Sequence, residues 1–398
     1  MARVAFINIP AHGHTNPTVP LVAELVRQGE EVVYYTFPPF RAALERAGAQ
    51  VRTYADEVAL DATQPDPNLL RLATRLMEAT LEILPELVAR LRADQPDYII
   101  HDSLCPWGKY AAAILGVPAI CSTTTFAINS RVAVRDLGQA WAFTQMMAAA
   151  LPALKRFRRA AAVLARDYGV AAPPLMEMFR NESALNLVYT SRYFQPFAAS
   201  FPPSYAFVGP DFALERLAES WSRHGDAPLV YISLGTLFNE RLDFYRLCFA
   251  ALGDLPLEVV MSVGNKVALA DMGAIPANFT VRASVPQLAV LQQAAAFVTH
   301  GGMNSVQEAL FWGVPLVVVP QAADQMFVAQ QVPALGAGVR LLNKDVTAAR
   351  LRHAVQSVVQ APQYREASAR VGASFRAAGG AKRAAEEIMA FKQRYNIT

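Results

Sequence analysis

Two histidine-containing turns hold the side chains whose types and spacing most clearly suit binding or catalysis. In "AAFVTHGGMNSVQE", His300 ends an apolar run, two glycines follow, and Asn304 and Ser305 open the next segment. Glycine lets the backbone turn tightly and approach a ligand closely. A helix start presents N–H groups and a partial positive charge that suit phosphate. The pattern predicts a strand, a turn at Gly302 and a helix start that binds a diphosphate, with His300 as a further N–H donor.

The same residues have a purely structural interpretation. The run "SVQE" is typical of a capping box, in which Ser305 caps the helix and Glu308 reaches back from three residues on. Taken alone, the pattern favours capping over ligand binding for these two side chains. The two interpretations are compatible, because a carboxylate one turn inside the helix can also accept both hydroxyls of a ribose.

Polar residues follow two further apolar runs of the second half. Asp324 and Gln325 come just after "VPLVVVP", where such a pair can bind the hydroxyls of a hexose, although the dipeptide alone is not diagnostic. Thr236 ends "YISLGT", which is consistent either with an ordinary strand–helix turn or with a loop near the phosphates.

The second histidine turn, "PAHGHTNP", lies near the N-terminus. Asn16 is expected to cap a helix, so that His14 lies near its positive end, which favours the neutral imidazole that a general base needs. Asp102 ends the run "YIIHD" and could bond the far nitrogen of His14, fixing its tautomer. A solvated loop histidine and a turn-capping aspartate remain the alternatives, and His12 and His101 are not assigned to catalysis.

Composition excludes several classes of function. The chain has 398 residues, 53% of them hydrophobic and 17% charged, and a formal net charge of +3 without a basic run. Nucleic acid is therefore not an expected partner. We expect no membrane span, because no apolar run reaches about 18 residues. The three cysteines are expected to be buried thiols, and the chain is expected to be cytoplasmic, since it begins with a strand rather than a leader.

Strand-like and helix-like segments alternate along the chain, which predicts an α/β fold with parallel sheets. The pattern of strand, small-residue loop and helix that opens the chain occurs again at the start of its second half. We therefore expect two Rossmann-like domains, residues 1–210 and 228–398 with the terminal helix, joined by a linker at 211–227. Ligands of such sheets bind at the carboxyl ends of the strands, so we expect a cleft between the two domains.

The segment from Ser284 to Gln325 resembles the donor-binding signature of the family 1 glycosyltransferases, which use nucleotide sugars. The whole chain is similar in length and order to bacterial macrolide and flavonoid glucosyltransferases with the GT-B fold, two Rossmann-like domains facing across a cleft. The matching residues are Pro286, Gln287, Leu291, Phe297, His300, Gly302, Asn304, Ser305, Glu308, Pro315, Pro320, Asp324 and Gln325.

The resemblance implies a role for each donor-binding residue. His300, Asn304 and Ser305 would bind the diphosphate, Gly302 would let the backbone approach it, and Glu308 would bind the ribose. It also favours a phosphate contact for Thr236.

The rest of the donor would be held by residues on either side of that turn. Asp324 and Gln325 would bind the sugar, and Val285 and Gln287 would contact the uracil. Ser284 stands where plant members have a tryptophan that stacks on the uracil, which bears on the choice between UDP and TDP.

The resemblance also implies a catalytic pair, His14 and Asp102, and an inverting transfer of glucose from UDP-glucose to a hydroxyl of a hydrophobic acceptor. No cofactor and no metal are expected, because the chain has no D-x-D sequence and no metal-ligand spacing. Two alternatives stay open, a UDP-sugar 2-epimerase and a non-catalytic accessory protein that binds nucleotide sugars.

Apolar residues of the first half could line an acceptor pocket or simply form core; they are Phe126, Trp141, Phe143, Met146 and Met147.

Overall fold

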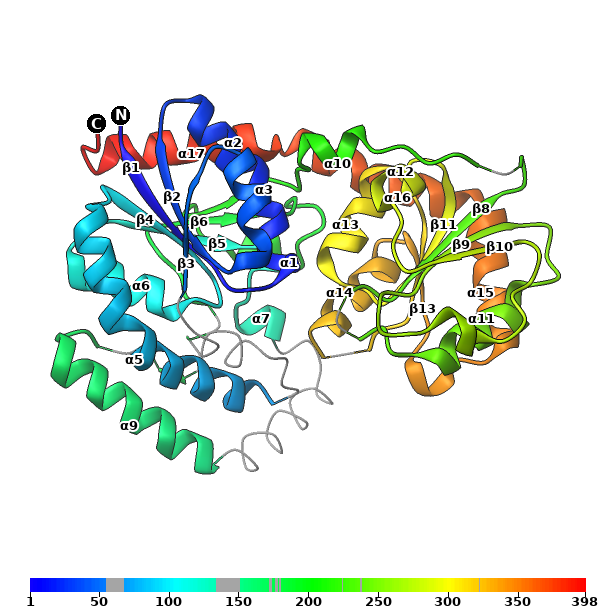
Figure 1. Cartoon of the computed structure of the whole chain (residues 1–398), viewed down its shortest axis with the longest axis horizontal. Helices are drawn as coiled ribbons and strands as arrows, with labels where there is room; N and C mark the ends of the chain where they lie inside the picture. The colour runs from blue at the N-terminus through cyan, green and yellow to red at the C-terminus, as the bar shows by residue number, and fades with distance from the viewer. Residues whose placement is uncertain are drawn as a thin grey trace. The chain divides into compact units, whose positions relative to one another are not determined.

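The computed structural model describes the chain except residues 55–67, 134–150, 172–173, 176–177, 179, 224, 237 and 322 (Figure 1). The described residues form two compact units. The first unit comprises Met1–Phe212 with Ala378–Thr398, and the second comprises Ala213–Ala377. Each unit is built on one parallel sheet, which confirms the expected α/β class with two Rossmann-like domains.

The sheet of the first unit has the strand order β3-β2-β1-β4-β5-β6-β7. Its central strands are apolar on both faces, as expected for a parallel sheet covered by helices on both sides. The strands are β1 (Arg3–Ile7), β2 (Glu31–Thr36), β3 (Gln50–Thr53), β4 (Tyr98–Asp102), β5 (Ala119–Thr123), β6 (Leu185–Val188) and β7 (Tyr205–Phe207).

Helices connect these strands, and the long helix α5 packs against both α6 and α9 (Figure 1). Short 3-10 turns lie at 16–18, 38–40 and 198–200. The α-helices are α1 (His12–Thr15), α2 (Val19–Arg27), α3 (Arg41–Arg46), α5 (Leu69–Asp94), α6 (Pro106–Leu115), α7 (Ser130–Ala133), α9 (Leu151–Tyr168) and α17 (Gly380–Arg394).

The C-terminal helix α17 belongs to the first unit, so the expected assignment of residues 228–398 to one domain needs correction. The helix packs against α2, and its apolar side chains Ile388 and Phe391 are fully buried. Lys392 on the same face forms a buried ion pair with Glu30, which follows α2. The amphipathic pattern predicted the helix, but only the tertiary structure decides which apolar surface it covers.

The sheet of the second unit has the order β10-β9-β8-β11-β12-β13, again with every pairing parallel. Its core joins residues of the central strands to those of helices α11 and α15. The strands are β8 (Leu229–Ser233), β9 (Glu258–Ser262), β10 (Phe279–Arg282), β11 (Ala294–Thr299), β12 (Leu316–Val318) and β13 (Gly338–Arg340).

The helices of this unit include the two that follow the strand tips of interest, α13 after β11 and α14 after β12. Short 3-10 turns lie at 269–272 and 343–345. The α-helices are α10 (Leu214–Ala218), α11 (Leu242–Leu252), α12 (Gln287–Leu291), α13 (Met303–Phe311), α14 (Ala323–Ala334), α15 (Ala348–Gln360) and α16 (Pro362–Ala377).

Both expected helix caps are wrong. Helix α13 begins one turn earlier than the capping box requires: its N-cap is Gly302, in an extended conformation, and no side-chain cap bond forms there. Ser305 therefore lies inside the first turn. Similarly, Asn16 is the first residue of a 3-10 turn that continues α1 into α2, so it is not the cap of a helix. The hydroxyl of Thr18 donates to the backbone carbonyl of Thr15 in this turn. Sequence spacing allowed both caps, but the backbone starts the helices elsewhere.

The structure also bears on the expectations for the cysteines and for membrane-spanning helices. All three cysteines, Cys105, Cys121 and Cys248, are buried thiols, as expected. In the part of the chain that the structure describes, we find no helix with the length and apolar character needed to cross a lipid bilayer.

Candidate active site

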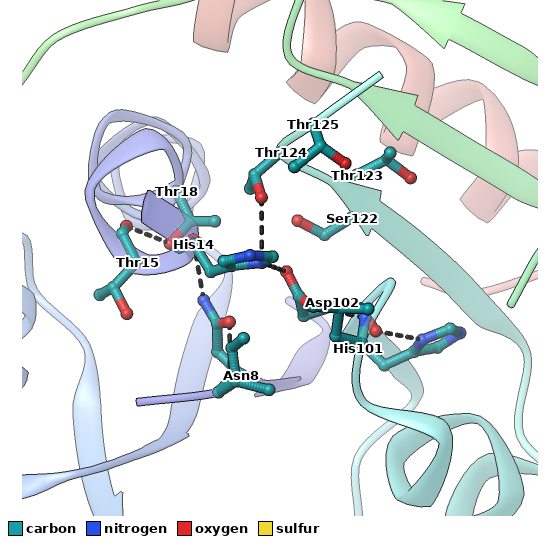
Figure 2. A network of polar contacts seen from close by, with 12 residues as sticks. Asn8, His14, Thr15, Thr18, His101, Asp102, Ser122, Thr123, Thr124 and Thr125 are labelled. Atoms are coloured by element: carbon teal, nitrogen blue, oxygen red, sulfur yellow. Dashed lines mark hydrogen bonds and ion pairs between the residues drawn. The ribbon is translucent and has the colours of Figure 1, made fainter. Parts of the chain in front are cut away.

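His14 and Asp102, predicted as a pair from the sequence, are in direct contact in the first unit. Strands β1 and β4 are neighbours, so the turn after β1 and the end of β4 meet at one edge of the sheet. The Nδ1 atom of His14 lies 2.8 Å from Oδ2 of Asp102, as Figure 2 shows. The other carboxylate oxygen accepts the backbone N–H of Leu104 at 2.7 Å. Asp102 is fully buried, so its carboxylate is held in one orientation.

Thr124 is a neighbour of this pair that the sequence analysis missed. It follows β5, the next strand of the sheet, and its hydroxyl oxygen lies 3.0 Å from the same Nδ1 of His14 (Figure 2). Asn8 holds the other side of the turn, because its amide donates to the backbone carbonyl of His14 at 3.1 Å. The signal that could have found Thr124 is its position in "STTTF", at the tip of the strand beside β4.

These contacts give the imidazole a defined chemical form. When Nδ1–H donates to Asp102, the lone pair of the ring is on Nε2. The His14 side chain is 13% exposed, so the ring is largely buried but still reaches the surface. A histidine held in this way can accept a proton at Nε2, and the buried carboxylate stabilises the imidazolium that forms.

His101 precedes Asp102 on β4 but points away from His14 (Figure 2). Its ring bonds Ser183 Oγ at 2.8 Å through Nε2 and the carbonyl of Asp102 at 3.1 Å through Nδ1. Burial lowers the pKa of His101 to about 4. Neutral His101 is thus a buried residue whose ring bonds the backbone of Asp102. This structural role agrees with leaving it out of the catalytic assignment.

The proposed acceptor pocket is only partly covered by the structure. Phe126 is 4% exposed and packs against Phe194, with ring centroids 5.3 Å apart, so it is a buried apolar residue. The other four candidates lie outside the described residues, and they are Trp141, Phe143, Met146 and Met147.

In the second unit, His300 lies between two glycines from adjacent strand tips. Strands β8 and β11 pair directly, so Gly235 after β8 and Gly302 after β11 approach the same ring. A Cβ atom at Gly235 would lie 2.5 Å from Cε1 of His300, and one at Gly302 would lie 2.4 Å from Nε2. Gly235 also has a φ of +76°, which favours glycine. Both glycines are therefore required by the position of the imidazole.

The turn around His300 has the features of an anion site. Burial lowers the pKa of His300 to about 4, against a smaller opposite effect of its hydrogen bond to the Ser233 backbone, so the ring is neutral at neutral pH. Helix α13 starts directly after Gly302 and directs the positive end of its dipole toward this edge. Asn304 and Ser305 are half-buried on its first turn, and Thr236 is exposed after β8. The structure thus brings the predicted phosphate-binding residues to one sheet edge.

Glu308 lies one turn further along α13 and is 4% exposed. Gln287 Nε2 donates to its Oε2 at 2.6 Å, and Arg216 Nη1 donates to its Oε1 at 2.8 Å. Arg216 was not among the predicted residues. Val285, in the loop before α12, is half-buried, and Ser284 beside it is exposed.

The predicted sugar-binding pair lies at the tip of β12. Gln325 is 5% exposed, and its side-chain oxygen accepts the backbone N–H of Gln321 at 2.8 Å. The Gln321 side chain in turn accepts a hydrogen bond from Arg241, which ties the tip to the loop after β8. Asp324 lies in the first turn of α14, and its side chain is outside what the structure describes.

No group of three or more His, Cys, Asp or Glu side chains that could hold a metal ion occurs among the described residues. The feature at the second-unit site that favours an anion is the start of α13, with its N–H groups and its helix dipole. The metal-independence of the chemistry stays a prediction.

Comparison with known proteins identifies relatives along the whole chain. Residues 246–390 match the family model "Erythromycin biosynthesis protein CIII-like, C-terminal domain". The chain is 37% identical to NDP-glycosyltransferase YjiC of Bacillus subtilis (strain 168), over 98% of each protein. It is 31% identical to demethyllactenocin mycarosyltransferase of Streptomyces fradiae, over 98% of this chain and 86% of that protein. The crystal structure of CalG4, the calicheamicin glycosyltransferase, superposes with a TM-score of 0.86 at 31% identity, covering 99% of both chains.

The buried, neutral His101 predicts that acid destabilises the first unit. Its folded-state pKa of about 4 is below the ordinary value near 6.5, so between these values the unfolded chain binds more protons. The stability that depends on neutral His101 is therefore present above pH 6.5 and is lost as the pH falls toward 4. From pH 7 to pH 5 we expect a loss of about 2 kcal/mol.

Urea unfolding at both pH values measures this difference. His101→Asn should reduce the loss on going to pH 5, whereas His353→Asn, at an exposed position of α15, should not. An unchanged pH dependence in the His101 variant would contradict the assignment.

Proposed function

The chain belongs to the family 1-like nucleotide-sugar glycosyltransferases with an EryCIII-like C-terminal domain, and on this premise we propose that it glucosylates hydrophobic natural products. The donor is UDP-glucose. The acceptor is a hydroxyl group of a flavonoid, another phenolic compound, a polyketide or a macrolide. The product is a β-glycoside, formed by one inverting displacement. The observation that carries the proposal is the direct contact of His14 with buried Asp102.

In this proposal His14 is the general base. Its Nε2 takes the proton of the acceptor hydroxyl while the oxygen attacks the anomeric carbon of the donor. Asp102, 2.8 Å from Nδ1, fixes the tautomer and balances the positive charge that develops on the ring. A single attack from the side opposite the leaving group turns the α-linked donor into a β-linked product.

The second unit holds the donor and stabilises the leaving UDP. The neutral His300 ring and the first turn of α13 lie at the diphosphate, where negative charge grows during the reaction. Glu308 binds the ribose, Val285 and Gln287 lie at the uracil, and Asp324 with Gln325 binds the glucose hydroxyls. Fixed N–H donors and a helix dipole supply the stabilisation that a bound cation supplies in metal-dependent enzymes, so we propose that no metal is needed.

The acceptor class is supported by two relatives. Demethyllactenocin mycarosyltransferase and the calicheamicin glycosyltransferase are named for natural products, and each resembles this chain over nearly its whole length. The aromatic pair of Phe126 and Phe194 in the first unit suits a hydrophobic acceptor.

Mass spectrometry of the reaction products tests the proposal as a whole. The purified protein is incubated with UDP-glucose and a panel of flavonoids and macrolides, with and without EDTA. We expect a product heavier by one hexosyl unit, in equal amounts with and without EDTA, and a β-linkage by proton NMR. Tight UDP binding without transfer to any acceptor would instead favour an accessory protein that binds nucleotide sugars. Conversion of the sugar without an acceptor would favour a UDP-sugar 2-epimerase.

Substitution of the base tests the mechanism. His14→Ala should lower kcat by about a hundredfold to ten-thousandfold, because it removes a positioned proton acceptor. The KM for UDP-glucose should change little, because the donor is held by the second unit. Steady-state kinetics separate the two constants. His12→Ala is the matched control: this histidine is exposed two residues away on the same helix, and near-normal turnover is expected. Near-normal turnover of His14→Ala would refute the assignment.

A further inference from the structure

The carboxylate of Glu308 is held in place by a network of side chains from three other elements of the second unit. Arg216 of α10 donates to Oε1 at 2.8 Å, and Gln287 of α12 donates to Oε2 at 2.6 Å. The Glu308 side chain is only 5% exposed. Each carboxylate oxygen therefore already has one donor from the protein itself.

The direction of this network is fixed by Tyr231 on strand β8. Its hydroxyl donates to Oε1 of Gln287 at 3.1 Å, and burial raises the pKa of Tyr231, which keeps the phenol protonated. Because the oxygen of the Gln287 amide receives this bond, its NH₂ group must face Glu308. The ring of Tyr231 is itself stacked on Phe297 of β11, with centroids 4.8 Å apart. Gln287 is thus a rigid support for one carboxylate oxygen.

An ionised carboxylate has about four lone-pair sites, two on each oxygen. Arg216 and Gln287 occupy one site on each, which leaves one further acceptor site on each oxygen of Glu308. Two acceptors on one rigid carboxylate match a pair of adjacent hydroxyls, such as the 2′- and 3′-hydroxyls of a ribose. Arg216, Gln287 and Ser305 around the carboxylate are all partly exposed, so the side chains that surround Glu308 reach the surface although the carboxylate itself is buried.

Arg216 supplies the charge that this arrangement needs. A carboxylate buried to this degree is strongly unfavourable without a cation. Among the residues that the structure describes, Arg216 is the cation that forms an ion pair with Glu308. Its own side chain is 31% exposed, so the guanidinium lies between the carboxylate and the surface. Without it, the carboxylate would turn toward Gln287 or toward water, and its two remaining acceptor sites would no longer match the diol.

We propose that Arg216 is a positioning residue for the nucleotide, and that its ion pair with Glu308 makes the site select ribose over 2′-deoxyribose. This inference rests on the proposed function and specifies the donor: a uridine nucleotide is preferred to a thymidine nucleotide through its ribose. A 2′-deoxy nucleotide leaves one acceptor site of the buried carboxylate unfilled. We expect that loss to weaken binding about tenfold, or about 1.4 kcal/mol.

Calorimetric binding of UDP and 2′-deoxy-UDP to the full chain tests the inference, since the two ligands differ by one hydroxyl. For the unmodified protein we expect 2′-deoxy-UDP to bind about tenfold more weakly than UDP. Arg216→Met keeps an apolar side chain but removes the cation, and the two dissociation constants should come within about twofold of each other. Arg216→Lys restores a charge and should regain part of the preference.

A second arginine–glutamate pair of the same unit provides the matched control. Nε of Arg223 lies 3.2 Å from Oε2 of Glu258. The two side chains are 28% and 9% exposed, close to the 31% and 5% of Arg216 and Glu308. Glu258 starts β9, at the opposite edge of the sheet from the tip of β11. Arg223→Met should therefore cost similar stability and leave the ratio of the two dissociation constants unchanged. Arg216→Gln provides a second uncharged variant if Arg216→Met does not fold.

The possible outcomes separate this inference from the proposed function. If the unmodified protein binds UDP and 2′-deoxy-UDP equally well, or if the preference survives in both uncharged variants, the role of Arg216 is refuted. Glucosyl transfer by the same preparation would then leave the proposed function standing. Binding of neither nucleotide by the unmodified protein would overturn both.

Discussion

The hydrogen bond between His14 and Asp102 is the interaction on which the functional account of this protein depends. It joins residues 88 positions apart in the chain, and it forms because β1 and β4 are adjacent in a parallel sheet. Burial of the carboxylate, its second bond to the Leu104 amide and the contact of Thr124 with the ring all act to hold one imidazole in one orientation. The contact of His14 with Asp102 is therefore a property of strand order as much as of residue type.

The second unit follows the same rule with different chemistry. Its candidate phosphate- and sugar-binding residues come after β8, β11 and β12, which are consecutive strands of the second sheet, so their carboxyl ends gather at one edge. Two glycines make room for a neutral histidine, and a helix begins where an anion would lie. One fold principle, applied twice, thus brings His14 to Asp102 in the first unit and the His300 turn to the start of α13 in the second.

The sequence predicted the strands and motifs well because both are local patterns. The runs ending at Asp102 and Thr299 have apolar residues followed by polar ones at the strand end, and the residues from His300 to Glu308 form one turn and one helix start. Arg216 and Thr124 were missed because their contacts join positions 92 and 110 residues apart, which no local pattern encodes. The capping assignment of Ser305 was wrong for a different reason. The extended backbone at Gly302 starts α13 before the serine, and sequence spacing does not distinguish the two starts.

The most direct test of the account is the protonation state of the His14 ring, measured by nitrogen-15 NMR of histidine-labelled protein at neutral pH. The signals are assigned by their absence in His14→Ala. We predict a neutral ring with the proton on Nδ1 and the lone pair on Nε2, and a loss of this tautomer preference in Asp102→Asn. A ring with the proton on Nε2, unchanged by the Asp102 substitution, would contradict the claim that this pair provides the base.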